Sequence, residues 1–254
     1  MSQSTTAEPA PTAAMLLIGN ELLSGRTQDK NLAHLANRLV SRGIRLSEAR
    51  VIADHEDVIV NAVNELREKY TYVFTTGGIG PTHDDITADC IAKAFGVALP
   101  HHPDAKDILL EFFKSRGIEP NDDRLRMARI PEGGTLVHNA ISAAPGFRMQ
   151  NVFVFAGVPK IMQAMLEEVL PELEQGPLVH SITVKCNLGE GTLAAPLRAL
   201  QEAHPNVDLG SYPGKDATGF KVSLVARGTD VEELAVVEQG LVDLVHEAGG
   251  QSLE

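Results

Sequence analysis

Three short apolar segments in the first two thirds of the chain each run into a turn that contains glycine. They comprise residues 15–18, 72–74 and 152–155, and they are typical of buried strands. Segments with apolar residues at helical spacing, such as residues 32–40 and 58–66, lie between them. This alternation of strands and helices predicts an α/β fold with a mostly parallel sheet covered by helices on both faces.

A change in composition at residues 174–177 (Glu-Gln-Gly-Pro) predicts a domain boundary. The residues beyond it follow the order strand, helix, strand, strand, helix, which indicates a small α+β domain over residues 178–250. Residues 1–13 are rich in Ser, Thr, Ala and Pro and are predicted to form a disordered leader. The main α/β domain is then expected over residues 14–175.

The segment of residues 75–87 (TTGGIGPTHDDIT) follows the second apolar segment and precedes a predicted helix. A glycine-rich turn of this kind exposes backbone N–H groups, and the start of a helix adds partial positive charge, so the segment favours an anion such as phosphate. It matches neither the dinucleotide pattern GxGxxG nor the Walker pattern GxxxxGK[ST]. A tight turn without any ligand is the alternative.

Two carboxylates, Asp84 and Asp85, lie within this segment, and no Lys or Arg occurs between Thr71 and Lys93. Carboxylates beside a phosphate repel it unless a hard cation separates them. We therefore predict that Asp84 and Asp85 hold a divalent metal, Mg²⁺ or Co²⁺. The alternative is that the pair only caps the following helix.

Other polar residues follow the predicted strands, at the sheet edge where open α/β sheets bind ligands. Asp54 is a candidate third carboxylate or else the N-cap of the next helix, and Asn31 is a polar candidate or merely solvated. The predicted phosphate- and ligand-binding residues are Gly19, Asn20, Glu21, Thr76, Gly77, Gly78, Gly80, Pro81, Thr82, Gly157 and Pro159.

The overall charge limits the partners that this chain can have. The formal net charge is −12, there is no Trp, and no segment reaches the length of apolar residues that spans a membrane. A nucleic acid or an anionic membrane surface would be repelled by that average charge, so neither is an expected partner. The two cysteines, Cys90 and Cys186, form no metal or disulfide pattern, and a reducing cytoplasm is the expected location.

Taken together, these motifs resemble a known family. Residues 18–25 (IGNELLSG), Asn31, residues 75–87, residues 144–147 (APGF) and residues 157–159 (GVP) resemble the molybdopterin-binding MoaB/Mog domain. More narrowly, they resemble the N-terminal domains of the competence/damage-inducible CinA proteins and of eukaryotic FAD synthases. The resemblance covers about residues 14–173, and residues 178–250 resemble the small domain that follows in CinA-type proteins.

The resemblance implies a three-layer α/β/α fold, a homo-oligomer, and a pocket at the strand ends for a pterin or a nucleotide diphosphate. Asp54 and Asp85 match two aspartates that act around adenylyl transfer in the molybdenum-cofactor enzymes. The CinA branch implies metal-dependent hydrolysis of pyrophosphate bonds, with ADP-ribose as the characteristic substrate. The sequence departs from the family pattern at Ala156, where Pro is usual, and at Ser142-Ala143, where Gly-Thr is usual.

Three functions remain open on this basis. The first is a metal-dependent pyrophosphohydrolase of ADP-ribose or a related nucleotide diphosphate, in which a metal-bound water attacks phosphorus. The second is a module that binds a molybdopterin or nucleotide without turnover. The third is a molybdopterin adenylyltransferase-like protein of molybdenum cofactor biosynthesis.

Overall fold

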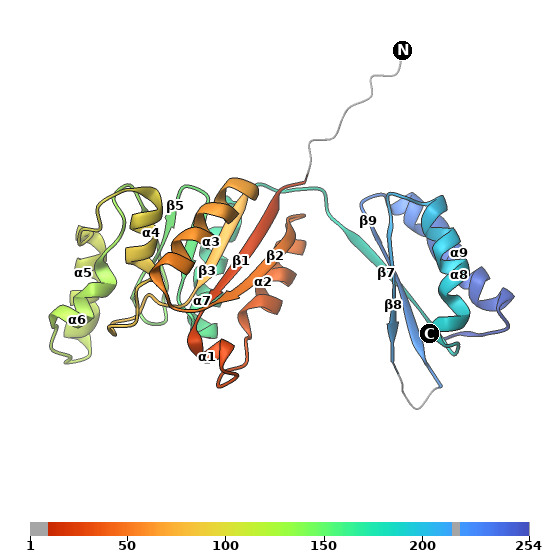
Figure 1. Ribbon diagram of the computed structural model, residues 1–254, viewed down its shortest axis with the longest axis horizontal. Coiled ribbons are helices and arrows are strands. Elements are labelled where there is room, and N and C mark those ends of the chain that lie inside the picture. The colour runs from red at the N-terminus through yellow and green to blue at the C-terminus, as the bar shows by residue number, and fades with distance from the viewer. Residues whose placement is uncertain (1–9, 215–218, 254) are drawn as a thin grey trace, which may run out of the picture. The chain divides into compact units, whose positions relative to one another are not determined.

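The computed structural model describes residues 10–214 and 219–253, and the chain divides into two units between Gly176 and Pro177 (Figure 1). The elements of the first unit are β1 (Thr12–Ile18), α1 (Asn20–Leu23), α2 (Asn31–Val40), β2 (Arg45–Ile52), α3 (Glu56–Lys69), β3 (Tyr72–Thr76), α4 (Thr87–Phe95), α5 (Pro103–Ser115), α6 (Asp122–Leu125), η1 (Arg126–Ala128), β4 (Thr135–Val137), β5 (Gly146–Met149), β6 (Val152–Phe155), α7 (Pro159–Val169) and η2 (Leu170–Glu172).

The six strands of this unit form one sheet in the order β2-β1-β3-β6-β5-β4. The first four strands are parallel, and β5 and β4 pair antiparallel at one edge. The two central strands β3 and β6 are buried throughout, as expected for parallel strands covered on both faces. The predicted α/β class with a mostly parallel sheet is confirmed.

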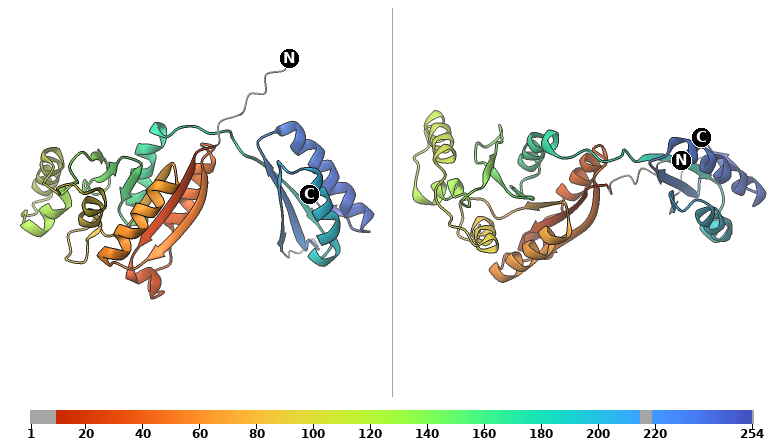
Figure 2. Two further views of the ribbon diagram at one scale, coloured as in Figure 1. Left: turned by 45° about the horizontal axis from the view of Figure 1, so that its top comes forward. Right: turned by 90° about the horizontal axis from the view of Figure 1, so that it is seen from above.

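Helices lie on both faces of the sheet (Figure 2). A hydrophobic core of buried side chains lies between the sheet and its helices on each face. Side chains of α3, α4 and α5 pack on one face, and side chains of α2 and α7 pack on the other. The second core contains a cluster of aromatic rings in which Phe74 and Phe153 stack at 5.1 Å between ring centroids. These three layers hold the strand ends rigidly, so the loops that follow the strands have fixed starting points.

The second unit contains β7 (His180–Cys186), α8 (Glu190–Ala203), β8 (Asp208–Pro213), β9 (Val222–Gly228), α9 (Val231–Glu247) and β10 (Ser252–Leu253). Its strands form an antiparallel sheet in the order β10-β7-β9-β8, and a separate core lies between that sheet and the two helices. The predicted small α+β domain is confirmed. The last strand, β10, extends two to three residues past the limit of 250 that we expected from the sequence.

Three local features differ from the expectations. Residues 1–9 of the predicted leader lie outside the described residues, and β1 already begins at Thr12 because Thr12 and Ala13 pair with β2. Residues 128–147 contain several Gly and Pro residues, which favour turns, yet they include β4 and the start of β5. Val58 is 41% exposed and does not belong to the buried face of α3.

No helix within the described ranges is long and apolar enough to cross a membrane.

Candidate functional site

The glycine loop after β3 is fixed by contacts that only glycine permits at two positions. Gly77 and Gly78 have φ angles of 102° and 68°, in the left-handed region that side chains disfavour. A β-carbon on Gly77 would collide with the carbonyl oxygen of Ile18, and one on Gly78 would collide with the hydroxyl of Thr87. The loop therefore lies directly against the end of β1 and the first turn of α4.

The far end of the loop closes through Asp85 and Thr82. Asp85 Oδ2 accepts hydrogen bonds from the Thr82 amide (2.8 Å) and the Thr82 hydroxyl (2.5 Å), and the Asp85 amide donates to the Thr82 carbonyl (3.1 Å). The Thr82 hydroxyl, followed by the backbone amide of Asp84, also lowers the pKa of the exposed Asp84 carboxyl. Oδ2 of Asp85 is therefore committed to shaping the loop.

Between these two ends, the loop offers free backbone donors. The Gly77 amide donates to the Phe155 carbonyl (3.1 Å), but the amides of Gly78, Ile79 and Gly80 donate to no protein acceptor within the described residues. A run of unsatisfied N–H groups in a turn that leads into a helix is the physical basis of anion binding.

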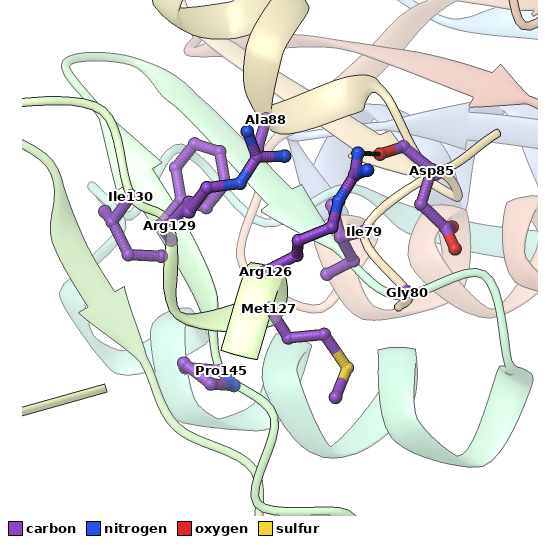
Figure 3. A pocket seen from close by; sticks show the side chains of 11 residues that line it. Ile79, Gly80, Asp85, Ala88, Arg126, Met127, Arg129, Ile130 and Pro145 are labelled. Carbon is purple, nitrogen blue, oxygen red and sulfur yellow. Dashed lines mark hydrogen bonds between the residues drawn. The ribbon is translucent and has the colours of Figure 1, made fainter. Parts of the chain in front are cut away.

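A cleft lies beside this run of amides. It is lined by Gly78, Ile79, Gly80, Asp85, Ala88, Arg126, Met127, Arg129, Ile130, Pro145 and Phe147 (Figure 3). The Arg126 guanidinium is turned toward Asp85 and donates a long hydrogen bond (3.5 Å) to its carbonyl oxygen. Arg129 makes a bidentate ion pair with Asp89 at 2.8 and 2.9 Å. We call these residues the arginine cleft.

The two arginines come from a segment about 45 residues further along the chain. Three backbone hydrogen bonds join residues 98–102 to residues 128–132: Glu132 N to Ala98 O, Ile130 N to Pro100 O, and His102 N to Ala128 O. This short ladder holds the segment that follows η1 beside the chain after α4, and the Arg129–Asp89 ion pair ties it to the first turn of α4. The sequence argument that the loop lacks positive charge is therefore wrong, because the charge reaches the loop through tertiary structure.

A second pocket lies at the ends of β1, β3 and β6. It is lined by Ile18, Glu21, Leu22, Thr27, Gln28, Asp29, Lys30, Asn31, Thr76, Gly157 and Pro159, and we call it the strand-end pocket. Asn31 is 5% exposed, which corrects the alternative that it is merely solvated. Its Nδ2 donates to the Gly157 carbonyl (2.9 Å), while its buried Oδ1 has no partner among the described residues.

Asp54 holds the turn after β1 in place. Its Oδ2 accepts a hydrogen bond from the Asn20 amide (2.8 Å), and the N-cap of α3 is His55, so the alternative of an N-cap role for Asp54 is wrong. Asp54 follows β2, whereas Asp85 lies in the loop after β3, and β1 lies between these strands. The strands that precede the two aspartates, β2 and β3, are therefore separated by two strand spacings of about 4.8 Å each.

A divalent metal fits this site only in part. The described residues contain no group of three or more His, Cys, Asp or Glu side chains that could hold a metal ion. Asp85 Oδ2 is committed to Thr82, while Asp84 is exposed. Mg²⁺ commonly binds through one or two carboxylates together with phosphates of the substrate. Asp84 and Asp85 could hold a metal in that way, but they form no metal cage on their own.

The residues predicted from sequence therefore divide between two places. Gly78, Gly80 and Asp85 line the arginine cleft. Glu21, Thr76, Gly157 and Pro159 line the strand-end pocket, while Gly77 lies between the two places and contacts Gly157. Pro81, Thr82 and Asp84 are exposed on the loop, and Gly19 and Asn20 form the turn that Asp54 holds. Arg126 and Arg129 were missed, and no signal in a single sequence links them to the loop.

Comparison with known proteins assigns the fold to a family. Residues 14–175 match the model of the "Probable molybdopterin binding domain", and residues 178–251 match the model of the "FAD synthase, middle domain". The chain belongs to the first of these families. The resemblance to CinA-type MoaB/Mog proteins is confirmed.

The similar proteins include full-length relatives and a solved structure. A protein of Aeropyrum pernix is 33% identical over 89% of this chain and 89% of its own length. A CinA-like protein of Salinibacter ruber is 30% identical over 92% of this chain, which spans 61% of that relative's length. The crystal structure of CinA from Thermoplasma acidophilum, a protein of unknown function, is similar to this chain with a TM-score of 0.59 at 33% identity, and the match covers 64% of this chain and 98% of that one.

Proposed function

We propose that the α/β domain binds a phosphate-bearing nucleotide or pterin, with the phosphate in the arginine cleft and the ring in the strand-end pocket. The observation that carries this proposal is that Gly78, Ile79 and Gly80, whose amides donate to no acceptor among the described residues, line the same cleft as Arg126. Family membership supports a pterin-like or nucleotide-like ligand but leaves its identity open.

The arginine cleft suits a phosphate group on two grounds. Backbone amides that need no reorganisation can donate to phosphate oxygens, and the partial positive charge at the start of α4 favours an anion. Arg126 adds a full positive charge and a planar set of donors, and its Nε is buried without a partner among the described residues. The terminal nitrogens of the Arg126 guanidinium can donate to phosphate oxygens in the cleft.

The strand-end pocket suits a ring that carries N–H groups. Its polar lining is rich in acceptors, which include the Glu21 carboxylate and the unsatisfied Asn31 Oδ1. Pterins and adenine both present an amino group and ring nitrogens along one edge, and the amino group can donate to such acceptors. A buried acceptor without a donor costs about 1–3 kcal/mol, so a donor from the ligand at Asn31 would be favourable.

A second candidate function, hydrolysis of the pyrophosphate bond of ADP-ribose, is favoured by the position of the aspartates. Asp85 lies at the cleft where the phosphate would bind, and its Oδ1 makes no hydrogen bond with the described residues. A metal carried in by the substrate would supply Lewis-acid activation. In this reaction Asp84 and Asp85 would hold that metal, Asp54 would orient the turn after β1, and Arg126 would neutralise charge on the phosphoryl oxygens.

The binding proposal is tested by titration calorimetry with matched pairs of ligands, adenosine against AMP and neopterin against neopterin phosphate. We expect the phosphorylated member of at least one pair to bind more tightly. Arg126→Gln should weaken that binding about tenfold while leaving the unphosphorylated ligand unchanged, because a charge-assisted hydrogen bond is lost. Arg116→Gln changes an exposed arginine outside the cleft and is the control.

Failure of every ligand to bind, or equal affinity for both members of each pair, would overturn the proposal. Hydrolysis is tested separately by release of AMP from ADP-ribose with and without Mg²⁺ or Co²⁺, beside the Asp85→Asn variant. Binding without turnover would support a module that binds its ligand without hydrolysing it, and it would exclude the hydrolase. The homo-oligomer implied by the resemblance remains a prediction, and light scattering of the purified chain would test it.

A further inference from the structure

The two edges of the six-stranded sheet differ in how they are protected against pairing with another chain. One edge is β2, which pairs with β1 across a bulge. On β2 the Glu48 carboxylate accepts hydrogen bonds from Arg50, Lys69 and Tyr70. Bulges and charged side chains are devices that keep an edge strand from pairing further. The other edge is β4, a Thr-Leu-Val strand in unbroken register with β5, and its short length is its only protection.

The free backbone groups of β4 follow from the bonds further inside the sheet. The Asn151 and Phe155 carbonyls, at the two ends of β6, accept hydrogen bonds from the chain of β3 and the residue after it. Backbone groups alternate between the two sides of a strand, so the same alternation across the register of β5 leaves Thr135 and Val137 bonded to β5. The Leu136 N–H and C=O groups therefore point away from the sheet. Within the described residues β4 pairs with no other strand.

A groove of about 340 Å³ lies beside this edge, on the face of the sheet that α7 covers. Its lining includes Thr135 and Val137 of β4, Arg148 of β5, Glu168 of α7 and Glu172 of η2. We call it the β4 groove. A strand added beside β4 would turn every second side chain toward this face of the sheet.

The β4 groove has an excess of negative charge. Glu168 is exposed and makes no ion pair with any described residue. Arg148 Nη1 lies 3.7 Å from Glu172 Oε2. Its Nε donates to the Gln150 carbonyl (2.7 Å), and its guanidinium lies over the Phe153 ring. The cation of the lining is thus already engaged, and the groove, like the chain as a whole with its charge of −12, attracts cations.

We propose that the β4 groove docks an extended basic segment of a partner protein, which adds to the sheet as a seventh strand. The backbone of that segment pairs with the Leu136 N–H and C=O groups, which gives affinity. Its Lys or Arg side chains at alternate positions meet Glu168 and Glu172, which gives specificity. Because β4 offers few backbone groups, the complex is weak and exchangeable.

Other occupants fit this edge less well. Two copies of this chain that paired their β4 strands about a twofold axis would place the Glu168 and Glu172 side chains of both on one face, where like charges repel. A free polyamine would neutralise the carboxylates, but it has no peptide groups to pair with Leu136. An anionic segment would be repelled by the groove and by the net charge of the chain.

The test measures the fluorescence anisotropy of two labelled heptapeptides with the full chain at low salt. One is Lys-Val-Lys-Val-Lys-Val-Lys, and the other has Pro in place of each Val, which keeps the charge but removes three amide donors. We expect the Val peptide to bind about fivefold more tightly, because it can pair as a strand. Glu168→Gln should weaken its binding about threefold, and less at high salt, since exposed ion pairs are screened. Glu111→Gln, an exposed carboxylate of α5 outside the groove, is the control.

A second variant separates strand pairing from attraction of charge. Leu136→Pro removes the outward N–H but no bond between β4 and β5, and proline is tolerated at such edge positions. It should lower the affinity for the Val peptide to that for the Pro peptide, whereas Leu136→Val, which keeps the amide, should not. Circular dichroism checks that each variant is folded, and if Leu136→Pro does not fold, the peptide pair and Glu168→Gln still decide the matter.

Equal affinity for the two peptides, or an unchanged affinity in Glu168→Gln, would overturn the proposal. Spermidine that bound as tightly as the Val peptide would also overturn it, since charge alone would then be recognised. So would a dimer in light scattering that Leu136→Pro dissociates, because a second copy would then occupy the edge. No nucleotide or pterin is present in these measurements, so their outcome is independent of the proposed function.

Discussion

The arginine cleft and the strand-end pocket meet near Gly77 and differ in the hydrogen-bonding groups that they leave unpaired. The cleft presents donors, with free amides at Gly78–Gly80 and the guanidinium of Arg126. The pocket presents acceptors, with the Glu21 carboxylate and the orphaned Asn31 Oδ1. The change occurs within two residues of chain, since Thr76 lines the pocket and Gly78 lines the cleft.

In the proposed function, this contrast places different parts of one ligand on the two sides of the loop. An anion gains from the donors and would be repelled by the carboxylates, while a ring with N–H groups gains from the acceptors. The contrast also changes the role of a metal. With Arg126 in the cleft, neutralisation of a phosphate does not depend on a cation held by Asp84 and Asp85.

The largest expected effect is that of Gly78→Ala. The φ of +68° and the collision with the Thr87 hydroxyl force the loop to move, so the free amides lose their alignment. We expect a loss of about 1–3 kcal/mol of stability and more than tenfold weaker binding of AMP, with adenosine less affected. Chemical denaturation and calorimetry measure the two quantities.

Gly189→Ala is the control for that substitution, because a β-carbon at Gly189 meets open space and its φ is ordinary. If Gly78→Ala bound AMP as the unchanged protein does, the loop amides could not be the phosphate donors. The assignment of phosphate-binding donors to the cleft would then be wrong.

The loop itself could be predicted from the sequence because its determinants are local. A buried strand, three glycines and a helix start lie within residues 72–87, and each acts on its immediate neighbours. The strand-end residues Glu21 and Gly157 could also be predicted, since parallel strands bring their carboxyl ends to one edge. Local pattern and sheet geometry were sufficient for this part of the site.

The arginine cleft could not be predicted because its walls are assembled by long-range pairing. Arg126 and Arg129 reach the loop through the ladder between residues 98–102 and 128–132. No periodic pattern in the sequence predicts that pairing. The segment also contains Pro131, Gly133 and Gly134, which favour turns and conceal the three-residue strand β4 that follows. Short strands next to glycine and proline carry too few residues for an alternating pattern.

The next largest effect is expected for Asn31→Asp, which alters only the strand-end pocket. The substitution removes the Nδ2 donor and places a carboxylate against the Gly157 carbonyl in a buried position. Repulsion between that carboxylate and the Gly157 carbonyl should displace residue 31 from the pocket wall. We therefore expect a loss of about 1–3 kcal/mol of stability and severalfold weaker binding of adenosine. Inorganic pyrophosphate, which has no ring, should bind as before.

Thermal denaturation and calorimetry with the two ligands separate these effects. Asn37→Asp, in the same helix α2 but outside the pocket, is the control. Equal weakening of adenosine and pyrophosphate would mean that the two sides of Gly77 are not independent.

A smaller effect is expected for Asp84→Asn. This substitution distinguishes repulsion between the Asp84 carboxylate and a bound phosphate from a role of Asp84 in metal binding. The Asp84 carboxyl has a lowered pKa, with the Thr82 hydroxyl as the first cause, so it remains charged throughout the neutral range. Removing that exposed charge should strengthen metal-free binding of AMP about twofold at low salt. Any gain in affinity on adding Mg²⁺ should shrink in the same variant.

Glu111→Gln, an exposed carboxylate on α5, controls for the general change in charge. An unchanged response to Mg²⁺ in Asp84→Asn would remove Asp84 from the proposed metal ligands. It would leave the assignment of phosphate to the arginine cleft untouched.

The smallest expected signal comes from Cys90, which lies on α4 behind the glycine loop. Burial, followed by the charges of Glu56 and Asp89, raises the pKa of its thiol to about 12, so about one molecule in ten thousand carries the thiolate at pH 8. The rate of alkylation should therefore be very low and should keep rising with pH beyond 10, because the fraction of thiolate grows until the pH reaches the pKa. Mass spectrometry of the Cys90 peptide measures it separately from Cys186.

Combined with the loop variants, the same measurement distinguishes the two sides of Gly77. The first turn of α4 is tied to the loop by the Thr87 amide, which donates to the Gly78 carbonyl, and by the Thr87 hydroxyl, which donates to the Gly77 carbonyl (both 2.9 Å). Gly78→Ala should loosen these bonds and speed alkylation of Cys90, whereas Asn31→Asp should not. Equal acceleration of alkylation in both variants would show that the domain opens as a whole. The cleft and the pocket would then belong to one cooperatively unfolding unit.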